Sequence, residues 1–300
     1  MNKKILVSGT GRCGTMTIGE IFNNELTISG HERINKNFFN FSKESFLLFK
    51  KGIKTNNFDE YYDFTNNKIN ILMNFKTEKS VIYSDPRFYN SFKEFKKSGW
   101  ETICLVRNPI ETVLSDLNYH YFSRRIEKVE ESKKQELLKK YEENKDKIIN
   151  RIKRNVTVNQ LGTGPLINKF ISPINIRQLF DNETNKLKIF PSKTTEINGL
   201  LFCNLDEFNK RLVCWAIKNY LMIDEKCEII HLENIKEEIK SVFSKYLTDK
   251  EVNLSIDILE KNGKYNSTKL KVFKKNDFDI KDEVKEFIFP VCELLNYSLD

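Results

Sequence analysis

The chain has 300 residues, of which 39% are hydrophobic and 12% aromatic, which is enough for one large domain with a buried core. Lysine and arginine number 50 against 42 for aspartate and glutamate, which gives a formal net charge of +8. This charge favours anionic ligands, but a nucleotide, nucleic acid or an anionic polysaccharide would all satisfy it, so it excludes none of them.

The first predicted element is a buried strand over residues 4–8, which runs into a glycine-rich turn. Gly9, Gly11 and Gly14 allow a tight backbone and the close approach of an anion. The helix that follows Gly14 would point its free N–H groups and the positive end of its dipole at the same place. We expect the buried face of this helix to carry Met16, Ile18, Ile21 and Phe22. The segment therefore predicts a binding site for a phosphate-like anion.

The glycine spacing alone leaves the anion undecided. Gly9, Gly11 and Gly14 match the G-x-G-x-x-G pattern of dinucleotide-binding loops, and Glu32 stands about 20 residues further on, where that pattern has its acidic residue. Nucleoside triphosphate loops carry a lysine after the last glycine, whereas Thr15 follows Gly14 here. A dinucleotide site, a triphosphate site and an ordinary strand-to-helix turn all stay open at this point.

Two further strands are predicted over residues 26–29 and 81–84, and polar residues follow each of them. The first leads to His31 and Glu32, and the second ends at Asp85. The chain between these strands is rich in phenylalanine, tyrosine and asparagine without regular spacing. We expect residues 35–74 to form helical fragments and loops beside an acceptor site, and residues 88–97 to form a helix.

The next strand, over residues 103–106, is apolar enough to be buried on both faces. Asn108 and Pro109 would end it and begin a helix, because asparagine is a good N-cap and proline suits the first helical position. Arg107 would then lie at the carboxyl end of a strand, where ligands bind in open α/β sheets. The alternatives are that Arg107 forms a surface ion pair and that Ser115 only lies on one face of the following helix.

Two segments resemble the nucleotide-binding motifs of sulfotransferases that use 3′-phosphoadenylyl sulfate (PAPS). Arg12-Cys13-Gly14-Thr15 resembles the [KR]-x-G-T core of their 5′-phosphosulfate loop. Residues 102–115 resemble their 3′-phosphate element, which is a strand, an Arg-[DN]-Pro turn and a helix that carries a serine. The resemblance implies that Gly11 to Met16 hold the 5′ end of the nucleotide and that Arg107 and Ser115 bind its 3′-phosphate.

The same resemblance implies a fold and a cosubstrate. The fold is an α/β three-layer sandwich in which helices flank a central, mostly parallel sheet of the P-loop type, and the predicted alternation of strands and helices agrees with it. PAPS would be the cosubstrate, 3′,5′-bisphosphorylated adenosine (PAP) the product, and no metal would be required. We expect one sulfotransferase domain over residues 1–300, with a charged helical and loop insertion at about residues 120–205 that covers the acceptor site.

The motifs in the second half of the chain are less specific than the two nucleotide-binding segments. Residues 123–155 are highly polar and predict solvated helices, and residues 156–201 predict an irregular lid or binding loop. A helix capped by Asp206 should run to about residue 224. The strand over residues 227–234 ends in Glu233-Asn234 and resembles the sulfotransferase strand that ends in a Glu-Asp or Glu-Asn pair. Lys264 and Asn266 fall where many members place a final 3′-phosphate loop, although a plain surface turn fits equally well.

If PAPS is the cosubstrate, the reaction is in-line transfer of a sulfuryl group to a hydroxyl or an amine, in which positioning and electrostatics dominate. Arg12 would stabilise the leaving oxygen as a permanent charge, since its pKa is too high for it to donate a proton. Glu32 is the first choice for the general base, because Gly30-His31-Glu32 resembles a G-H-E segment of bacterial sulfotransferases. Asp85 best matches the position at which cytosolic relatives have a histidine, and His31 is a third candidate as a base or as a ring that orients the acceptor.

Composition supplies the remaining expectations. Six cysteines and three histidines show no metal-ligand spacing, so we expect reduced core thiols in a cytoplasmic protein without a bound metal. No signal peptide or membrane span is expected, since the early apolar run is too short. The acceptor would be a small molecule, a glycan or a lipid, and no nucleic acid partner is expected. Two other functions stay open: a nucleotide kinase or other phosphate-transfer enzyme with a degenerate loop, and a non-catalytic protein that binds anionic polymers.

Overall fold

The computed structural model describes residues 2–32, 59–74, 77–89, 91–123, 129–154, 196–198, 200–263 and 271–299, with residues 44, 47, 48, 51, 55, 57 and 126 between them. The chain divides into two compact units. The first unit consists of Met1–Arg107 and Lys218–Ser267, and the second of Asn108–Ile217 and Thr268–Asp300. The expectation of one domain over residues 1–300 stays a prediction. Along the described residues, no helix has both the length and the apolar character needed to cross a membrane.

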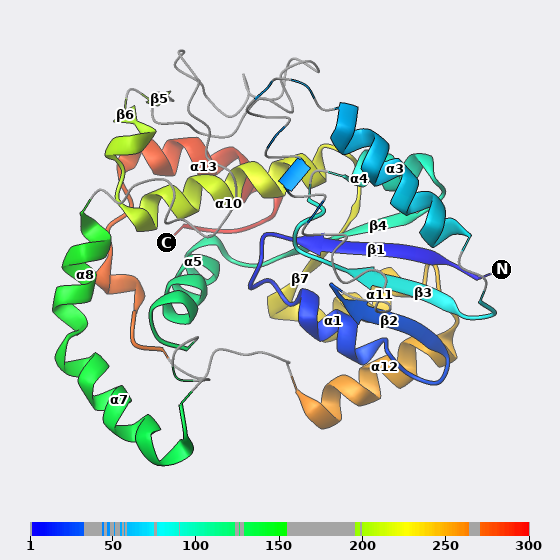
Figure 1. The fold of residues 1–300 in the computed structure, drawn as a ribbon, viewed down its shortest axis with the longest axis horizontal. Helices are drawn as coiled ribbons and strands as arrows, with labels where there is room; N and C mark the ends of the chain where they lie inside the picture. The colour runs from blue at the N-terminus through cyan, green and yellow to red at the C-terminus, as the bar shows by residue number, and fades with distance from the viewer. Residues whose placement is uncertain are drawn as a thin grey trace. The chain divides into compact units, whose positions relative to one another are not determined.

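A five-stranded sheet lies at the centre of the first unit, with the strand order β2-β3-β1-β4-β7 and every pair parallel. The strands are β1 (Lys4–Gly9), β2 (Thr27–His31), β3 (Ser80–Ser84), β4 (Glu101–Val106) and β7 (Glu228–His231). Helices flank this sheet (Figure 1), so the predicted α/β sandwich with a central parallel sheet is confirmed. In such a sheet all five strands end at the same edge, so the polar residues that follow them gather there.

Side chains alternate along each strand, so every second residue points to the same face of the sheet. One of the two faces packs against three helices. Ile5 and Val7 of β1, Ile82 of β3 and Ile103 of β4 belong to a fully buried cluster on this face. The helices that contribute to the same cluster are α1 (Thr15–Ile21), α11 (Ile235–Phe243) and α12 (Asp249–Asn262). Thr248 and Glu251 form a capping box at the start of α12, which fixes where this helix begins.

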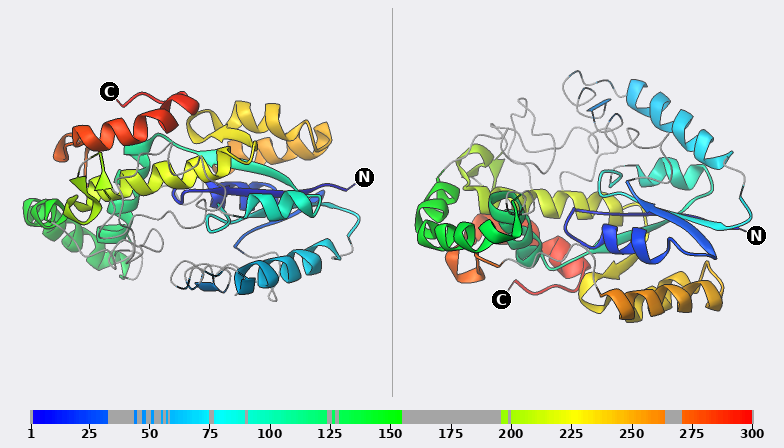
Figure 2. Two further views of the ribbon diagram at one scale, coloured as in Figure 1. Left: turned by 90° about the horizontal axis from the view of Figure 1, so that it is seen from above. Right: turned by 60° about the horizontal axis from the view of Figure 1, so that its bottom comes forward.

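Aromatic side chains pack over the opposite face of the sheet, on the side of α3 (Asp59–Met73) and α4 (Phe92–Lys97) (Figure 2). The Tyr83 ring of β3 packs edge-on against Phe88 at 5.8 Å between centroids, and Phe88 packs against Phe95 of α4 at 5.4 Å. Phe95 in turn contacts Trp100 at 5.2 Å. Both views of Figure 2 show α3 and α12 on opposite sides of the strands. The first unit therefore has two apolar layers, one on each side of the sheet.

The second unit is mainly helical. Its described elements are α5 (Pro109–Asn118), the π-helix η2 (Tyr119–Ser123), α7 (Glu131–Glu143), α8 (Lys145–Lys153), β5 (Glu196–Ile197), β6 (Leu200–Leu201), η4 (Phe202–Asn204), η6 (Lys275–Asp277), α13 (Asp282–Leu294) and residues 207–217 of α10 (Glu207–Ile223). Asn108 caps α5 by accepting from the Glu111 N–H at 3.1 Å, as predicted. Asp206 caps α10 in the predicted way, since its Oδ1 accepts from the Asn209 N–H at 2.8 Å.

A buried charge network stabilises the second unit internally. Arg211 and Glu207 of α10 are both 2% exposed at the side chain and form an ion pair. Arg211 also pairs with Asp116 of α5, and the Tyr121 hydroxyl donates to Glu207 Oε2 at 2.6 Å. Burial alone would lower the pKa of Arg211, but Asp116 and Glu207 raise it. The network therefore keeps the guanidinium charged and joins α5 and η2 to α10.

Several predicted details differ from the structure. Met16 is half-buried, and Thr15, Thr17 and Gly19 share the buried face of α1 with Ile18 and Ile21. The strand expected at residues 26–29 is β2 (Thr27–His31), and the helix expected at residues 88–97 begins only at Phe92. The 15-residue helix α3 lies within residues 35–74, the segment expected to form helical fragments and loops. Most of the lid expected at residues 156–201 lies outside the described residues, and its last part forms the antiparallel pair β5 and β6.

Gly9 gives a test of the packing at the end of β1. A Cβ at this position would lie 2.5 Å from the Leu105 carbonyl oxygen and would also overlap Cys13 Sγ. Because backbone cannot move aside easily, Gly9→Ala should lower the free energy of unfolding by about 1–3 kcal/mol, as other overpacking changes do. Urea denaturation measures this loss. Gly11→Ala serves as a comparison, since a Cβ at Gly11 would meet nothing within 4 Å and only its φ of +84° opposes the change. An unchanged midpoint for Gly9→Ala would contradict the packing argument.

Candidate functional site

The loop between β1 and α1 owes its shape to left-handed residues. Gly11 has a φ of +84°, Arg12 of +57° and Gly14 of +100°. Glycine adopts such angles at little cost, whereas arginine does not, so the conformation of Arg12 is strained. Gly14 is also close to a neighbour, because a Cβ there would lie 2.7 Å from Leu232 Cδ1. Strain of this kind persists only where the surrounding structure enforces it, and it is common at functional sites.

Cys13 and Thr15 hold this loop against the rest of the first unit. Cys13 is fully buried, and burial raises the pKa of its thiol to about 11. The thiol is therefore protonated at neutral pH, and Cys13 acts as a core residue rather than a nucleophile. The Thr15 carbonyl accepts a hydrogen bond from the Ser84 hydroxyl at 2.6 Å. This bond attaches the start of α1 to the carboxyl end of β3.

The loop and the end of β4 are in direct contact. Arg107 Nη1 donates a hydrogen bond to the Arg12 carbonyl oxygen at 3.4 Å. The Arg107 side chain and the Arg12 backbone, which are 95 residues apart in the sequence, therefore meet at one place in the first unit. Ser115 lies on α5 in the second unit and is partly buried, so its phosphate-binding role stays a prediction. Lys264 and Asn266 lie outside the described residues.

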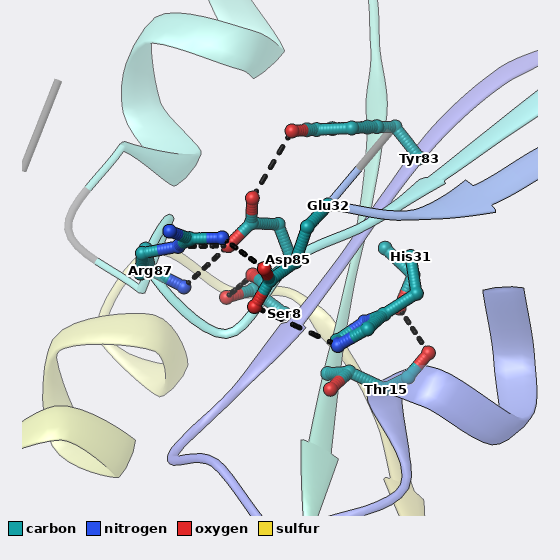
Figure 3. A network of polar contacts seen from close by, with 8 residues as sticks. Ser8, Thr15, His31, Glu32, Tyr83, Asp85 and Arg87 are labelled. Atoms are coloured by element: carbon teal, nitrogen blue, oxygen red, sulfur yellow. Dashed lines mark hydrogen bonds and ion pairs between the residues drawn. The ribbon is translucent and has the colours of Figure 1, made fainter. Parts of the chain in front are cut away.

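The three candidate bases lie together at the ends of β2 and β3 (Figure 3). Glu32 is attached to β3 because its N–H donates to the Ser84 carbonyl at 2.8 Å. His31 Nε2 lies 3.6 Å from Glu32 Oε1. The Asp85 N–H donates to the Val7 carbonyl at 3.0 Å, so Asp85 directly continues the sheet edge beside the loop. Glu32, His31 and Asp85, which were named from the sequence as alternative bases, thus lie in one cluster.

The two carboxylates of this cluster have different surroundings. The Asp85 side chain is 0% exposed, and its oxygens accept from the Arg87 N–H at 2.9 Å, from Arg87 Nε at 3.2 Å and from the Tyr83 hydroxyl at 3.0 Å. Glu32 is 39% exposed and pairs with Arg87 Nη2. Glu32 can therefore meet a ligand from solution, whereas Asp85 is enclosed by protein groups.

His31 is neutral at physiological pH. Burial lowers its pKa, and this effect exceeds the opposing influence of the Glu32 and Asp85 carboxylates. Its Nδ1 is buried without a hydrogen-bond partner among the described residues. A neutral imidazole can accept a proton, so its chemistry is compatible with either role predicted for it.

Arg87 is the residue that the sequence analysis missed. Burial alone would lower its pKa, but the Asp85 and Glu32 carboxylates raise it, so the guanidinium remains charged. The sequence feature that could have identified Arg87 is its position directly after Asp85-Pro86, at the carboxyl end of a predicted strand. A cation placed there reaches the same sheet edge as the loop.

Within the described ranges, no group of three or more histidine, cysteine, aspartate or glutamate side chains is arranged to hold a metal ion. Comparisons of the chain with protein-family models, curated proteins and solved structures give no match.

Proposed function

We propose that this protein is a sulfotransferase that moves a sulfuryl group from PAPS to a hydroxyl or an amine. The observation that carries the proposal is the hydrogen bond between Arg107 and the Arg12 carbonyl. It joins the two segments that resemble the 5′-phosphosulfate loop and the 3′-phosphate element. A loop with one cation would suit many anions, but two cations from two such elements suit a nucleotide that is phosphorylated at both ends.

The residues of the loop fit the 5′ end of this cosubstrate. Gly11 offers open space, since a Cβ there would meet nothing within 4 Å, and its left-handed conformation turns the backbone sharply. The backbone N–H groups from Cys13 to Met16 and the Arg12 guanidinium would bind the 5′-phosphosulfate. Arg107 would bind the 3′-phosphate. PAPS supplies the sulfuryl group and a phosphate leaving group that needs no proton near neutral pH.

Glu32 is the proposed general base. It is exposed enough to meet an acceptor, and it is connected to the loop through Ser84, which bonds both Glu32 and Thr15. Asp85 is fully enclosed, which favours Glu32 for proton transfer to or from an external ligand. The acceptor itself, whether a sugar, a lipid or a small metabolite, would be identified by incubating labelled PAPS and protein with a host-cell extract.

We also propose that the protein is located in the cytoplasm. Cys13, Cys104, Cys214, Cys227 and Cys292 are free thiols. Free buried thiols are typical of proteins in reducing compartments.

Nucleotide binding tests the proposed function. We expect PAP to raise the melting temperature markedly and 5′-AMP to raise it much less, because Arg107 would bind the 3′-phosphate that 5′-AMP lacks. Differential scanning fluorimetry measures both shifts, and Arg107→Ala should remove most of the difference between them. Equal shifts from the two nucleotides, or a magnesium-dependent shift with ATP alone, would overturn the assignment and favour a phosphate-transfer enzyme.

A further inference from the structure

Glu32 is held in an unusual backbone conformation. Its φ is +59°, in the left-handed region that glutamate rarely adopts. The conformation is enforced by the hydrogen bond from its N–H to the Ser84 carbonyl and by the preceding strand β2. A glycine or an asparagine would adopt this angle more easily, so a glutamate here indicates a requirement for the carboxylate itself.

The Glu32 side chain is oriented by Arg87, which follows β3, and by His31, which ends β2. Its Oε2 pairs with Arg87 Nη2, and its Oε1 faces His31 Nε2 at 3.6 Å. An exposed glutamate on its own samples several rotamers, whereas a bond to a guanidinium restricts it. The direction of the Glu32 carboxylate therefore depends on the position of Arg87.

Arg87 is fixed in turn by Asp85. Its N–H and its Nε both donate to Asp85 Oδ1, at 2.9 and 3.2 Å, which orients the guanidinium from the backbone outward. The Tyr83 hydroxyl donates to Asp85 Oδ2 at 3.0 Å, and the Ser8 hydroxyl donates to the Asp85 carbonyl at 2.6 Å. Tyr83 and Asp85 are 0% exposed. Figure 3 shows Tyr83, Asp85, Arg87 and Glu32 joined one to the next by these contacts.

We propose that Asp85 and Arg87 are positioning residues that hold the Glu32 carboxylate in place, with Tyr83 anchoring Asp85 from the core. The inference rests on the proposed function in one respect, the role of Glu32 as the base. Asp85 then acts through Arg87 and does not itself exchange a proton with the acceptor. Arg87 is suited to this task because its planar fork bonds one carboxylate through Nε and the other through Nη2.

We call the chain of contacts from Asp85 through Arg87 to Glu32 the relay, and the turnover of variants tests it. Arg87→Gln and Asp85→Asn should each lower kcat by about 100-fold, since a misplacement of about 1 Å can cost that much, while the KM for PAPS stays unchanged. Arg87→Lys should recover part of the loss, and Tyr83→Phe should lower kcat by a smaller factor. Lys245→Gln is the matched control, because it breaks the Lys245–Glu228 ion pair at another place in the same unit.

A double variant separates positioning from a general structural effect. In the Glu32→Gln background, Arg87→Gln should cause little further loss, because residues that act through one another are not additive. A full additional 100-fold loss there, or an unchanged kcat for Arg87→Gln alone, would overturn the proposal.

Titration of His31 by NMR gives a readout that does not depend on activity. The charged groups that face His31 are Glu32, Asp85 and Arg87, while α1 presents the uncharged Gly19 to it. Arg87→Gln should raise the pKa of His31 and Glu32→Gln should lower it, with the His231 signal as the internal reference. Because the Arg87 charge also acts on His31 directly, the relay is tested by the shift that Glu32→Gln causes, which should be smaller in the Arg87→Gln background than in the wild type. An equal shift in both backgrounds would contradict the relay even if the protein transfers no sulfate. Absence of PAP binding together with unequal shifts would instead reject the proposed function and retain the relay.

Discussion

Replacing Arg12 by glycine should lower the rate of sulfuryl transfer by about 100- to 1,000-fold, which is the usual cost of removing one donor that stabilises charge in a transition state. Affinity for PAP should fall by no more than about tenfold, because the loop backbone and Arg107 would still bind the nucleotide. Glycine is the right replacement, since Arg12 has a φ of +57° and alanine would be strained there. Single-turnover kinetics and calorimetric titration with PAP separate the two effects.

Arg12→Lys provides the control. Lysine keeps the positive charge and loses only the second donor of the fork, so turnover should stay within about tenfold of the wild type. Arg107→Gly is the complementary change, and it should weaken PAP binding more than it slows transfer. Wild-type turnover in Arg12→Gly, or a loss confined to PAP affinity, would show that Arg12 does not lie at the transferring group.

The sheet and the loop were predictable because their signals are local. The segments around Val7, Ile82 and Ile103 are short apolar runs that end in polar or turn residues, as strands buried on both faces do. The Asn108-Pro109 pair marks the start of a helix in the sequence itself, and Asn108 caps α5 as expected. A parallel sheet brings the strand ends to one edge, and the two segments that resemble sulfotransferase motifs, one with Arg12 and one with Arg107, meet there.

Other features depend on contacts that no local pattern reveals. Arg87 matters because β2 and β3 are neighbours and the His31–Ser84 register brings Glu32 beside the end of β3. The helix α1 has only seven residues, too few for its apolar spacing to show which side faces the sheet. Gly19 is buried because α1 packs closely against His31: a Cβ there would lie 2.6 Å from the His31 backbone nitrogen. Only the folded structure defines this contact.

Arg211→Met should lower the free energy of unfolding by about 3–5 kcal/mol, the usual cost of breaking a buried ion pair by removing one partner. Arg211 and Glu207 are both 2% exposed at the side chain, so the substitution leaves the Glu207 carboxylate buried without its counter-charge. The Tyr121 hydroxyl would be its remaining donor among the bonds described for it. Methionine has a similar length, which keeps the cavity small. Urea denaturation followed by circular dichroism measures the loss.

Two further variants assign the loss to the buried charge. Glu207→Gln combined with Arg211→Met should recover at least half of the lost stability, because the amide is uncharged and still accepts from the Tyr121 hydroxyl. Lys285→Gln breaks the exposed Lys285–Asp282 pair in the same unit and should change stability by less than about 1 kcal/mol. If the double variant were no more stable than Arg211→Met, lost packing of the arginine side chain would explain the effect, and the charge network would not be what joins α5 to α10.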